Sequence, residues 1–371
     1  MSRSGIDTYM GHARFTSPNH IDVGGQTLEF SKAIIATGGH AFIPPIPGIE
    51  EIGYLTNETL FQITEIPEHL IIIGGGPIGA EMAQSFRRFG ARVTLLDMAD
   101  RLLPRDDPEA SQIIMEQFTR ESIDFRLGAR VSRFRTEDGQ KIVCYERDGQ
   151  MIEVAGDAIL ISVGRRANVT ALNLDAADVA YDRRGIHVDD HLRSITNPNV
   201  LASGDVAGSW QFTHAADAMS RIALQNALFF GRKRVSALKM PWATYTDPEV
   251  AHVGIPHDEV ARRDDVQTFK VPLSGNDRAI LEGDTDGFVK VYATSGGALL
   301  GGTIVGRDAS AMIGELTVAL TGGLKLSTIA STIHPYPTTS DAIRAAGNDW
   351  NKTRFTPFAA KVLGWVLAAR R

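Results

Sequence analysis

Short apolar runs alternate with segments of helical periodicity in the first half of the chain. Residues 70–73 are all apolar, residues 78–89 repeat apolar side chains at helical spacing, and residues 93–97 begin as a second apolar run. A further helix is predicted at about residues 108–121, and residues 157–164 form a last buried strand. Strands that alternate with helices are typical of a parallel sheet. We therefore predict an α/β unit in this part.

The rest of the chain follows other patterns. Residues 141–147 and 151–154 flank an Asp-Gly pair, which predicts a β-hairpin. Residues 185–205 are expected to be β-rich, and residues 215–230 contain strong helix formers. From residue 240 the pattern is a mixture of strands and helices.

The last twenty residues predict a separate helix. Phe358, Val362, Trp365 and Ala369 recur at helical spacing, and basic residues end the chain. A helix that docks on its own dimer is favoured over an anchor on a membrane surface.

Gly74, Gly76 and Gly79 form a G-x-G-x-x-G motif between the apolar strand and the helix after it. There the first glycine allows the tight turn, and the second lets a pyrophosphate approach the backbone. The third lets the helix pack closely against the sheet, and the start of that helix offers N–H groups and a positive dipole to phosphates. The pattern predicts a dinucleotide site, with a merely structural glycine turn as the alternative.

Asp97 ends the next strand, where a carboxylate binds the ribose 2′-OH and repels a 2′-phosphate. This favours NAD over NADP as the cofactor. Arg101 and Arg105 follow closely and keep NADP open as the alternative, because either guanidinium can turn toward a phosphate.

Composition narrows the classes of function. The length of 371 residues suggests two or three domains, and the net charge of −6 argues against nucleic-acid binding. The apolar runs are too short to predict a membrane span, and no secretion signal is evident, so we expect a cytoplasmic location. Cys144 is the only cysteine and is expected to be a packed thiol. An intrachain disulfide and a cysteine-rich zinc site are excluded, and no metal site is predicted.

Six motifs, in this order along the chain, resemble the pyridine nucleotide-disulfide oxidoreductases, especially their mercuric-reductase-like and dihydrolipoamide-dehydrogenase-like branches. They are Ala36-Thr37-Gly38, the glycine motif with Glu81, residues 162–168, Ser203-Gly204-Asp205, residues 246–251 and residues 334–341. The resemblance implies a Rossmann-like NAD domain inserted in an FAD domain, then an α+β dimerisation domain that forms a homodimer. The implied parts are an FAD-domain remnant (1–60), the NAD(P) domain (61–168), a returning FAD segment (169–237), the dimerisation domain (238–350) and the tail helix (351–371).

The resemblance also implies roles for individual residues. Asp205 would bind the ribityl chain of FAD, although an aspartate that caps a helix is the plainer alternative. Glu81, His334, Tyr336 and Asp341 would be catalytic, with Asp341 orienting Tyr336. Structural alternatives are a helix-dipole acid for Glu81 and a structural loop histidine for His334. The cofactor-binding residues implied are Gly74, Gly76, Pro77, Ile78, Gly79, Asp97 and Gly164 with Gly38, Gly204, Asp205, His214 and Ala215.

Two elements of the family are missing from this sequence: a second glycine loop for FAD and a Cys-x4-Cys pair. We therefore expect a chain without the family's first segment that is inactive in disulfide chemistry. The expected reaction is transfer of hydride from NADH to FAD and on to a disulfide, a metal ion or another small-molecule or small-protein acceptor. Two alternatives are a non-catalytic NAD-binding, dimerising remnant and a flavin-free Rossmann dehydrogenase.

Overall fold

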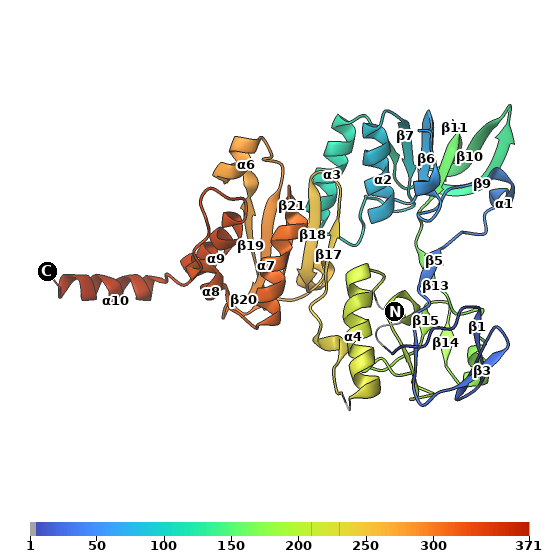
Figure 1. Ribbon diagram of the computed structural model, residues 1–371. Helices are drawn as coiled ribbons and strands as arrows, with labels where there is room; N and C mark the ends of the chain where they lie inside the picture. The colour runs from blue at the N-terminus through green and yellow to red at the C-terminus, as the bar shows by residue number, and fades with distance from the viewer. Residues whose placement is uncertain (1–4, 209, 230, 371) are drawn as a thin grey trace. The chain divides into compact units, whose positions relative to one another are not determined.

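The computed structural model describes residues 5–208, 210–229 and 231–370 (Figure 1). The chain forms two compact units, and each is built from two stretches of sequence. One comprises residues 1–42 and 164–238, and the other comprises residues 43–163 and 239–371. The five-part division and its boundaries stay a prediction.

Residues 43–163 contain a four-stranded parallel sheet with helices between its strands (Figure 1). Its elements are β6 (His69–Ile73), α2 (Pro77–Arg88), β7 (Arg92–Leu96), α3 (Pro108–Arg120), β8 (Asp124–Arg126) and β12 (Ala158–Ile161). The strand order is β12-β6-β7-β8, and every residue of the central β6 is buried. Helices α2 and α3 place Ala80, Ala83 and Phe118 in the same core as Leu95. The alternation of strands and helices predicted from the sequence is therefore confirmed.

A three-stranded antiparallel sheet lies in the same segment. Its strands are β9 (Arg130–Glu137), β10 (Gln140–Arg147) and β11 (Gln150–Gly156), and α1 (Ile49–Ile52) and a 3-10 turn (Leu60–Gln62) precede the parallel sheet. The pairing of Arg147 with Gln150 confirms the predicted hairpin. The thiol of Cys144 is buried and donates to Glu153 at 3.3 Å, and burial raises its pKa, as expected of a packed thiol.

Residues 239–371 form a five-stranded antiparallel sheet in the order β17-β18-β21-β20-β19, with helices after it. The elements are β17 (Pro241–Thr244), β18 (Glu249–Gly254), α5 (His257–Val260), β19 (Val266–Pro272), α6 (Asp277–Glu282), β20 (Phe288–Thr294), β21 (Leu299–Gly306), α7 (Ala309–Thr321), α8 (Leu326–Ser331), α9 (Asp341–Thr353) and α10 (Pro357–Ala368). Helix α9 was not predicted. Its Ala342, Ala346 and Trp350 are buried in the core of the sheet, so burial outweighs the poor helix propensity of Gly347 and Asn348.

A buried polar cluster joins the start of α3 to this sheet. The ammonium of Lys290 lies 2.5 Å from the Asp107 carboxylate, and the Tyr292 hydroxyl donates to the same oxygen at 3.1 Å. Asp107 also caps α3 by accepting from the Glu109 N–H at 2.9 Å. Both charged side chains are almost fully buried; Lys290 supplies the countercharge of Asp107 and is also paired with Glu109 at 2.8 Å.

The other unit contains small sheets and one long helix. Its elements are β1 (Ala13–Ser17), β2 (His20–Val23), β3 (Gln26–Glu29), β4 (Ala33–Ile35), β5 (Gly39–Ala41), β13 (Arg165–Ala167), β14 (Tyr181–Asp182), β15 (Gly185–Ile186), β16 (Val200–Ala202) and α4 (Thr213–Leu228). Strand β4 pairs with β16 in parallel, and β5 pairs with β13. The predicted helix at residues 215–230 is confirmed with shifted ends, and Phe230 lies outside the described residues.

The expectation that residues 185–205 are β-rich is confirmed in part. Strands β15 and β16 lie there, and isolated bridges join Val188 to Ser194 and Arg193 to Leu201, whereas turns and bends occupy much of the rest. The carboxylate of Asp189 accepts from the N–H groups of His191 and Arg193, which closes a local turn. Such side-chain bonds to the backbone compete with strand pairing.

Candidate dinucleotide and electron-transfer site

The glycine loop after β6 owes its shape to contacts within the protein. Gly74 has a φ of 112°, and a Cβ there would lie 2.5 Å from the Ser162 carbonyl oxygen. At Gly79 a Cβ would lie only 1.8 Å from the Gly74 carbonyl oxygen. Close approach of backbone to backbone therefore requires glycine at both positions, as the sequence motif predicted.

Gly76 is a glycine for a different reason. Its φ of −73° suits any residue, and no atom lies within 4 Å of a Cβ built there. Gly76 is the N-cap of α2, has no side-chain cap, and is followed by Pro77 and the half-buried Ile78. The first N–H groups of a helix have no partner within the helix. Open space beside these groups is the arrangement that a pyrophosphate requires, so the residues present fit a dinucleotide.

Asp97 lies directly beside this loop. One carboxylate oxygen accepts from the N–H of Gly75, and the other accepts from the N–H of Ala99 at 2.7 Å. The Arg101 guanidinium donates to the carbonyl oxygens of Pro104 at 2.8 Å and Asp106 at 3.4 Å. Arg101 is thus held within its own loop, and the acid next to the glycine loop lacks a basic side chain bonded to it among the described residues.

Glu81 is fixed by the segment after β17. Its Oε1 accepts from the Tyr245 N–H at 2.8 Å, and burial raises the pKa of the carboxyl. One turn along α2, the Gln84 amide exchanges hydrogen bonds of 2.7 and 2.8 Å with the backbone of Asp247. Sequence reasoning missed Gln84 and Tyr245, because nothing in the sequence shows that α2 meets this segment.

Asp205 lies in the other unit and pairs with Arg165. The Arg165 Nη2 is 3.0 Å from the carboxylate and also donates to the Gly39 carbonyl at 2.9 Å. Gly204 and Gly38 both have positive φ, and no atom lies within 4 Å of a Cβ built at Gly38. Arg165 was not predicted as a site residue, although the Gly164-Arg165 pair in the family motif is a signal for it.

The start of α4 is near these residues in the same unit. Ala215 is buried, and the Ser203 hydroxyl donates to the Ala216 carbonyl at 3.4 Å. His214 is exposed, and its ring stacks on Phe212 with the centroids 5.3 Å apart. The unit of residues 1–42 and 164–238 therefore contains Gly38, Gly164, Asp205 and the first turn of α4, whereas the glycine loop, Asp97 and Glu81 belong to the other unit.

His334 and Tyr336 are each hydrogen-bonded to an acidic side chain, which for Tyr336 is not the expected Asp341. His334 Nε2 lies 3.0 Å from Glu315 on α7, and the exposed Tyr336 hydroxyl donates to Asp277 at 2.9 Å. The hydrogen bond to Asp277 raises the pKa of Tyr336. Asp341 accepts from Arg344 at 2.7 Å, so the expected orientation of Tyr336 by Asp341 is corrected: Asp277, on α6, takes that place.

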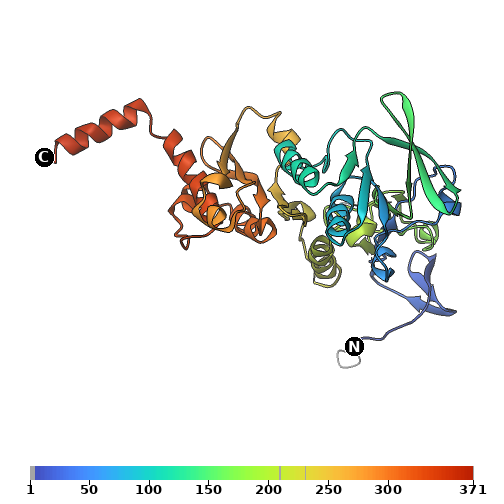
Figure 2. The same cartoon turned by 90° about the horizontal axis from the view of Figure 1, so that it is seen from above.

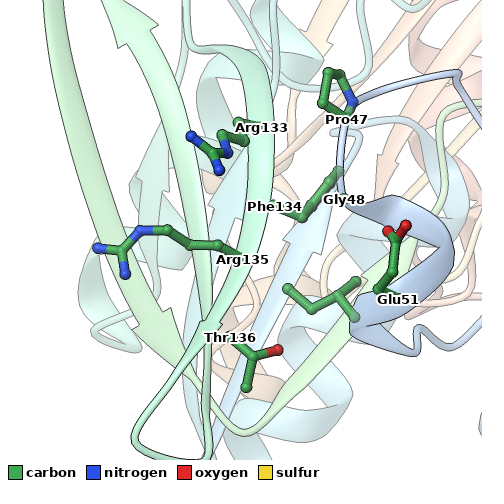
Figure 3. A pocket seen from close by; sticks show the side chains of 8 residues that line it. Pro47, Gly48, Glu51, Arg133, Phe134, Arg135 and Thr136 are labelled. Atoms are coloured by element: carbon green, nitrogen blue, oxygen red, sulfur yellow. The ribbon is translucent and has the colours of Figure 1, made fainter.

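A separate cavity lies between residues 47–52 and strand β9. Its volume is about 480 Å³. Figure 3 shows Arg133 and Arg135 of β9 opposite Gly48 and Glu51. Arg135 is paired with Glu137 and Glu153, and none of the predicted site residues lines the cavity.

Two further features bear on function. Within the described ranges, no group of three His, Cys, Asp or Glu side chains is arranged to hold a metal ion. No helix among the described residues is both long and apolar enough to cross a bilayer.

Comparison with known proteins gives consistent matches. Residues 1–220 match the family described as pyridine nucleotide-disulphide oxidoreductase, and residues 240–346 match its dimerisation domain. A mercuric reductase of Bacillus cereus is 32% identical over 345 residues, which cover 92% of this chain and 54% of that protein. A dihydrolipoyl dehydrogenase of Thermus scotoductus is 32% identical over 353 residues, which cover 94% of this chain and 76% of that protein.

A solved structure agrees with these relatives. The HOCl-induced flavoprotein disulfide reductase RclA from Escherichia coli superposes with a TM-score of 0.83 at 29% identity, over 91% of this chain and 78% of that one. The chain spans 54% of the length of the Bacillus cereus enzyme and 64% of that of a Staphylococcus aureus mercuric reductase. The matches confirm the resemblance and the fold class predicted from the motifs.

Proposed function

This chain belongs to the pyridine nucleotide-disulphide oxidoreductase family, and we propose that its reaction is transfer of hydride from NADH to FAD and of electrons on to an acceptor. The observation that carries this proposal is the glycine loop, with open space at Gly76 and a carboxylate, Asp97, beside it. NADH supplies the hydride and FAD accepts the electron pair; the protein supplies binding, orientation and electrostatics.

Each residue of the loop has a distinct task in this proposal. Gly74 and Gly79 hold the turn, and Gly76 lets the pyrophosphate reach the N–H groups at the start of α2. Asp97 accepts from the ribose hydroxyls with the lone pairs that its two backbone bonds leave available. A 2′-phosphate would be repelled by this carboxylate, which favours NADH over NADPH.

We assign Asp205, Gly38, Gly164, Gly204 and the start of α4 at His214 and Ala215 to FAD. The Arg165 guanidinium holds the Asp205 carboxylate in place, so that a carboxylate oxygen can accept from a hydroxyl of the ribityl chain. Both residues are mostly buried, which limits competition from water.

Residues of the C-terminal part are proposed to bind the electron acceptor and to transfer protons to it in a homodimer. The match of residues 240–346 to a dimerisation domain supports that assembly. Tyr336, exposed and hydrogen-bonded to Asp277, can offer its phenol to an acceptor, and His334 is a proton donor held by Glu315. Glu81, with its raised pKa, can carry a proton. The acceptor is proposed to be a disulfide, a metal ion or another small molecule or protein, met in the cytoplasm.

One observation favours a second candidate function. Cys144 is the only cysteine, and its buried thiol is bonded to Glu153. This chain alone therefore has no cysteine pair through which to reduce a disulfide. The second candidate is an NADH-binding, dimerising protein without turnover.

Titration with NADH and NADPH tests the cofactor proposal, with Asp97→Asn as the variant and Asp100→Asn, an exposed acid of the same loop, as the matched control. We expect NADH to bind more tightly than NADPH to the wild-type protein. Loss of a charged hydrogen-bond acceptor is worth about 1.5–3 kcal/mol, so Asp97→Asn should weaken NADH binding about tenfold or more. Equal affinity for both nucleotides, or equal effects of the two substitutions, would contradict the proposal.

A further inference from the structure

Helix α10 exposes nearly every large apolar side chain that it carries. Figure 2 shows α10 as a continuous helix after α9, and it spans the 12 residues Pro357–Ala368. Trp365 is 83% exposed and Phe358 is 76% exposed. Val362, Leu363, Val366 and Leu367 are also exposed, so the apolar surface extends around most of the helix. A helix that is apolar on all sides is normally buried against protein or lipid.

Helix α10 as the structure describes it is too short to cross a bilayer. At 1.5 Å per residue the helix is about 18 Å long, whereas the hydrocarbon core of a bilayer is about 30 Å thick. A helix of this length can lie in the interface between headgroups and acyl chains, where Trp is enriched.

The charges around α10 are all of one sign. After Asp349 the sequence has no acidic residue but five basic ones, in a protein whose net charge is −6. Lys352 is paired with Asp349 at 2.7 Å. In the part of the chain that the structure describes, Lys361 and Arg370 have no carboxylate within ion-pair distance. These charges complement an anionic surface.

We propose that α10 docks on the surface of an anionic lipid bilayer. Phe358, Val362 and Trp365 enter the apolar layer, while the stems of Lys361 and Arg370 let their charges reach lipid headgroups. A second copy of the chain fits less well, because paired α10 helices would bring like charges together. The match to a dimerisation domain also ends at residue 346, before α10 begins.

Vesicle flotation of the full chain tests this proposal. The wild-type protein should float with vesicles of pure phosphatidylglycerol and stay behind with vesicles of pure phosphatidylcholine. Phe358→Glu with Trp365→Glu should abolish flotation. Lys361→Gln and Arg370→Gln should each weaken the partitioning about fivefold, the factor that corresponds to about 1 kcal/mol per surface charge. Met151→Glu, an exposed apolar residue on β11, is the matched control and should float like the wild type.

The oligomeric state in the absence of lipid distinguishes docking on a bilayer from docking of α10 on a second copy of the chain. Sedimentation should show the same assembly for the wild type and for Phe358→Glu with Trp365→Glu, with unchanged thermal unfolding. Absence of flotation with phosphatidylglycerol would overturn the proposal. A double variant that dissociates the assembly would overturn it too, and would assign α10 to a second copy of the chain.

Discussion

Replacement of Gly76 by alanine should weaken NADH binding while it leaves the free energy of unfolding nearly unchanged. The backbone at Gly76 has φ −73° and ψ −174°, which alanine adopts without strain, and no atom lies within 4 Å of the new methyl group. Alanine is a poorer N-cap than glycine, by roughly 0.5 to 1 kcal/mol. It also reduces the entropy of the unfolded chain, which contributes about 0.4–1 kcal/mol in the opposite direction. We therefore expect a free energy of unfolding within about 0.5 kcal/mol of the wild type.

The effect on binding should be much larger. The methyl group occupies the space into which the proposed pyrophosphate must come, and overpacking of this kind costs about 1–3 kcal/mol. That range corresponds to a dissociation constant for NADH about 5- to 150-fold higher.

The assay is a fluorescence titration with NADH alongside urea unfolding. Gly296→Ala, where the nearest atom is 3.8 Å from the added Cβ, is the matched control and should change neither quantity. Gly79→Ala, whose Cβ would clash with the Gly74 carbonyl, should instead lower stability by about 3 kcal/mol. Wild-type affinity in a folded Gly76→Ala protein would refute the reasoning.

Three other expectations concern stability and the acceptor side. Lys290→Met leaves Asp107 buried without its countercharge and should cost about 3–5 kcal/mol in urea unfolding; a loss below about 1 kcal/mol would contradict this. Burial lowers the pKa of His252 from 6.5 to about 4. The unfolded chain therefore binds a proton more readily between these pH values, so the free energy of unfolding is highest above pH 6.5 and falls by up to about 3 kcal/mol as the pH falls toward 4. His252→Gln should remove that part of the pH dependence, measured by urea unfolding at a series of pH values, and an unchanged slope would count against it. Tyr336→Phe loses an exposed hydrogen bond to Asp277, so stability should change by less than about 0.5 kcal/mol, while steady-state reduction of the acceptor falls and NADH titration is unaffected; unchanged acceptor reduction would remove Tyr336 from the proposed site.

The nucleotide-binding part was predictable because its signals are local. The apolar strand, the glycine spacing and Asp97 all lie within about thirty residues, and each has one physical reason for its position. In the structure, a Cβ at Gly74 or Gly79 would clash with backbone atoms of the chain, whereas a Cβ at Gly76 would meet no atom within 4 Å. The motif predicts the same division of roles, and the structure adds which backbone atoms a Cβ would meet at Gly74 and Gly79.

Contacts between distant segments were not predictable. The Arg165–Asp205 pair joins residues 40 positions apart, and the bond from Tyr245 to Glu81 spans 164 positions. Tyr336 was aligned with Asp341 by family spacing, yet its hydroxyl meets Asp277, which is 59 residues earlier. Helix α9 was missed for a related reason, since its stability comes from burial of Trp350 in a core supplied by other elements.

The central claim is that this chain binds NADH for delivery of hydride to FAD. The most direct test is an anaerobic titration with NADH of the protein purified from the cells that make it, followed by the visible absorbance of flavin. We predict a bound flavin whose absorbance is bleached by about one equivalent of NADH, and to a smaller extent by NADPH. A bound flavin that NADH leaves unchanged, or flavin-free protein that reduces NAD with a small substrate, would contradict it.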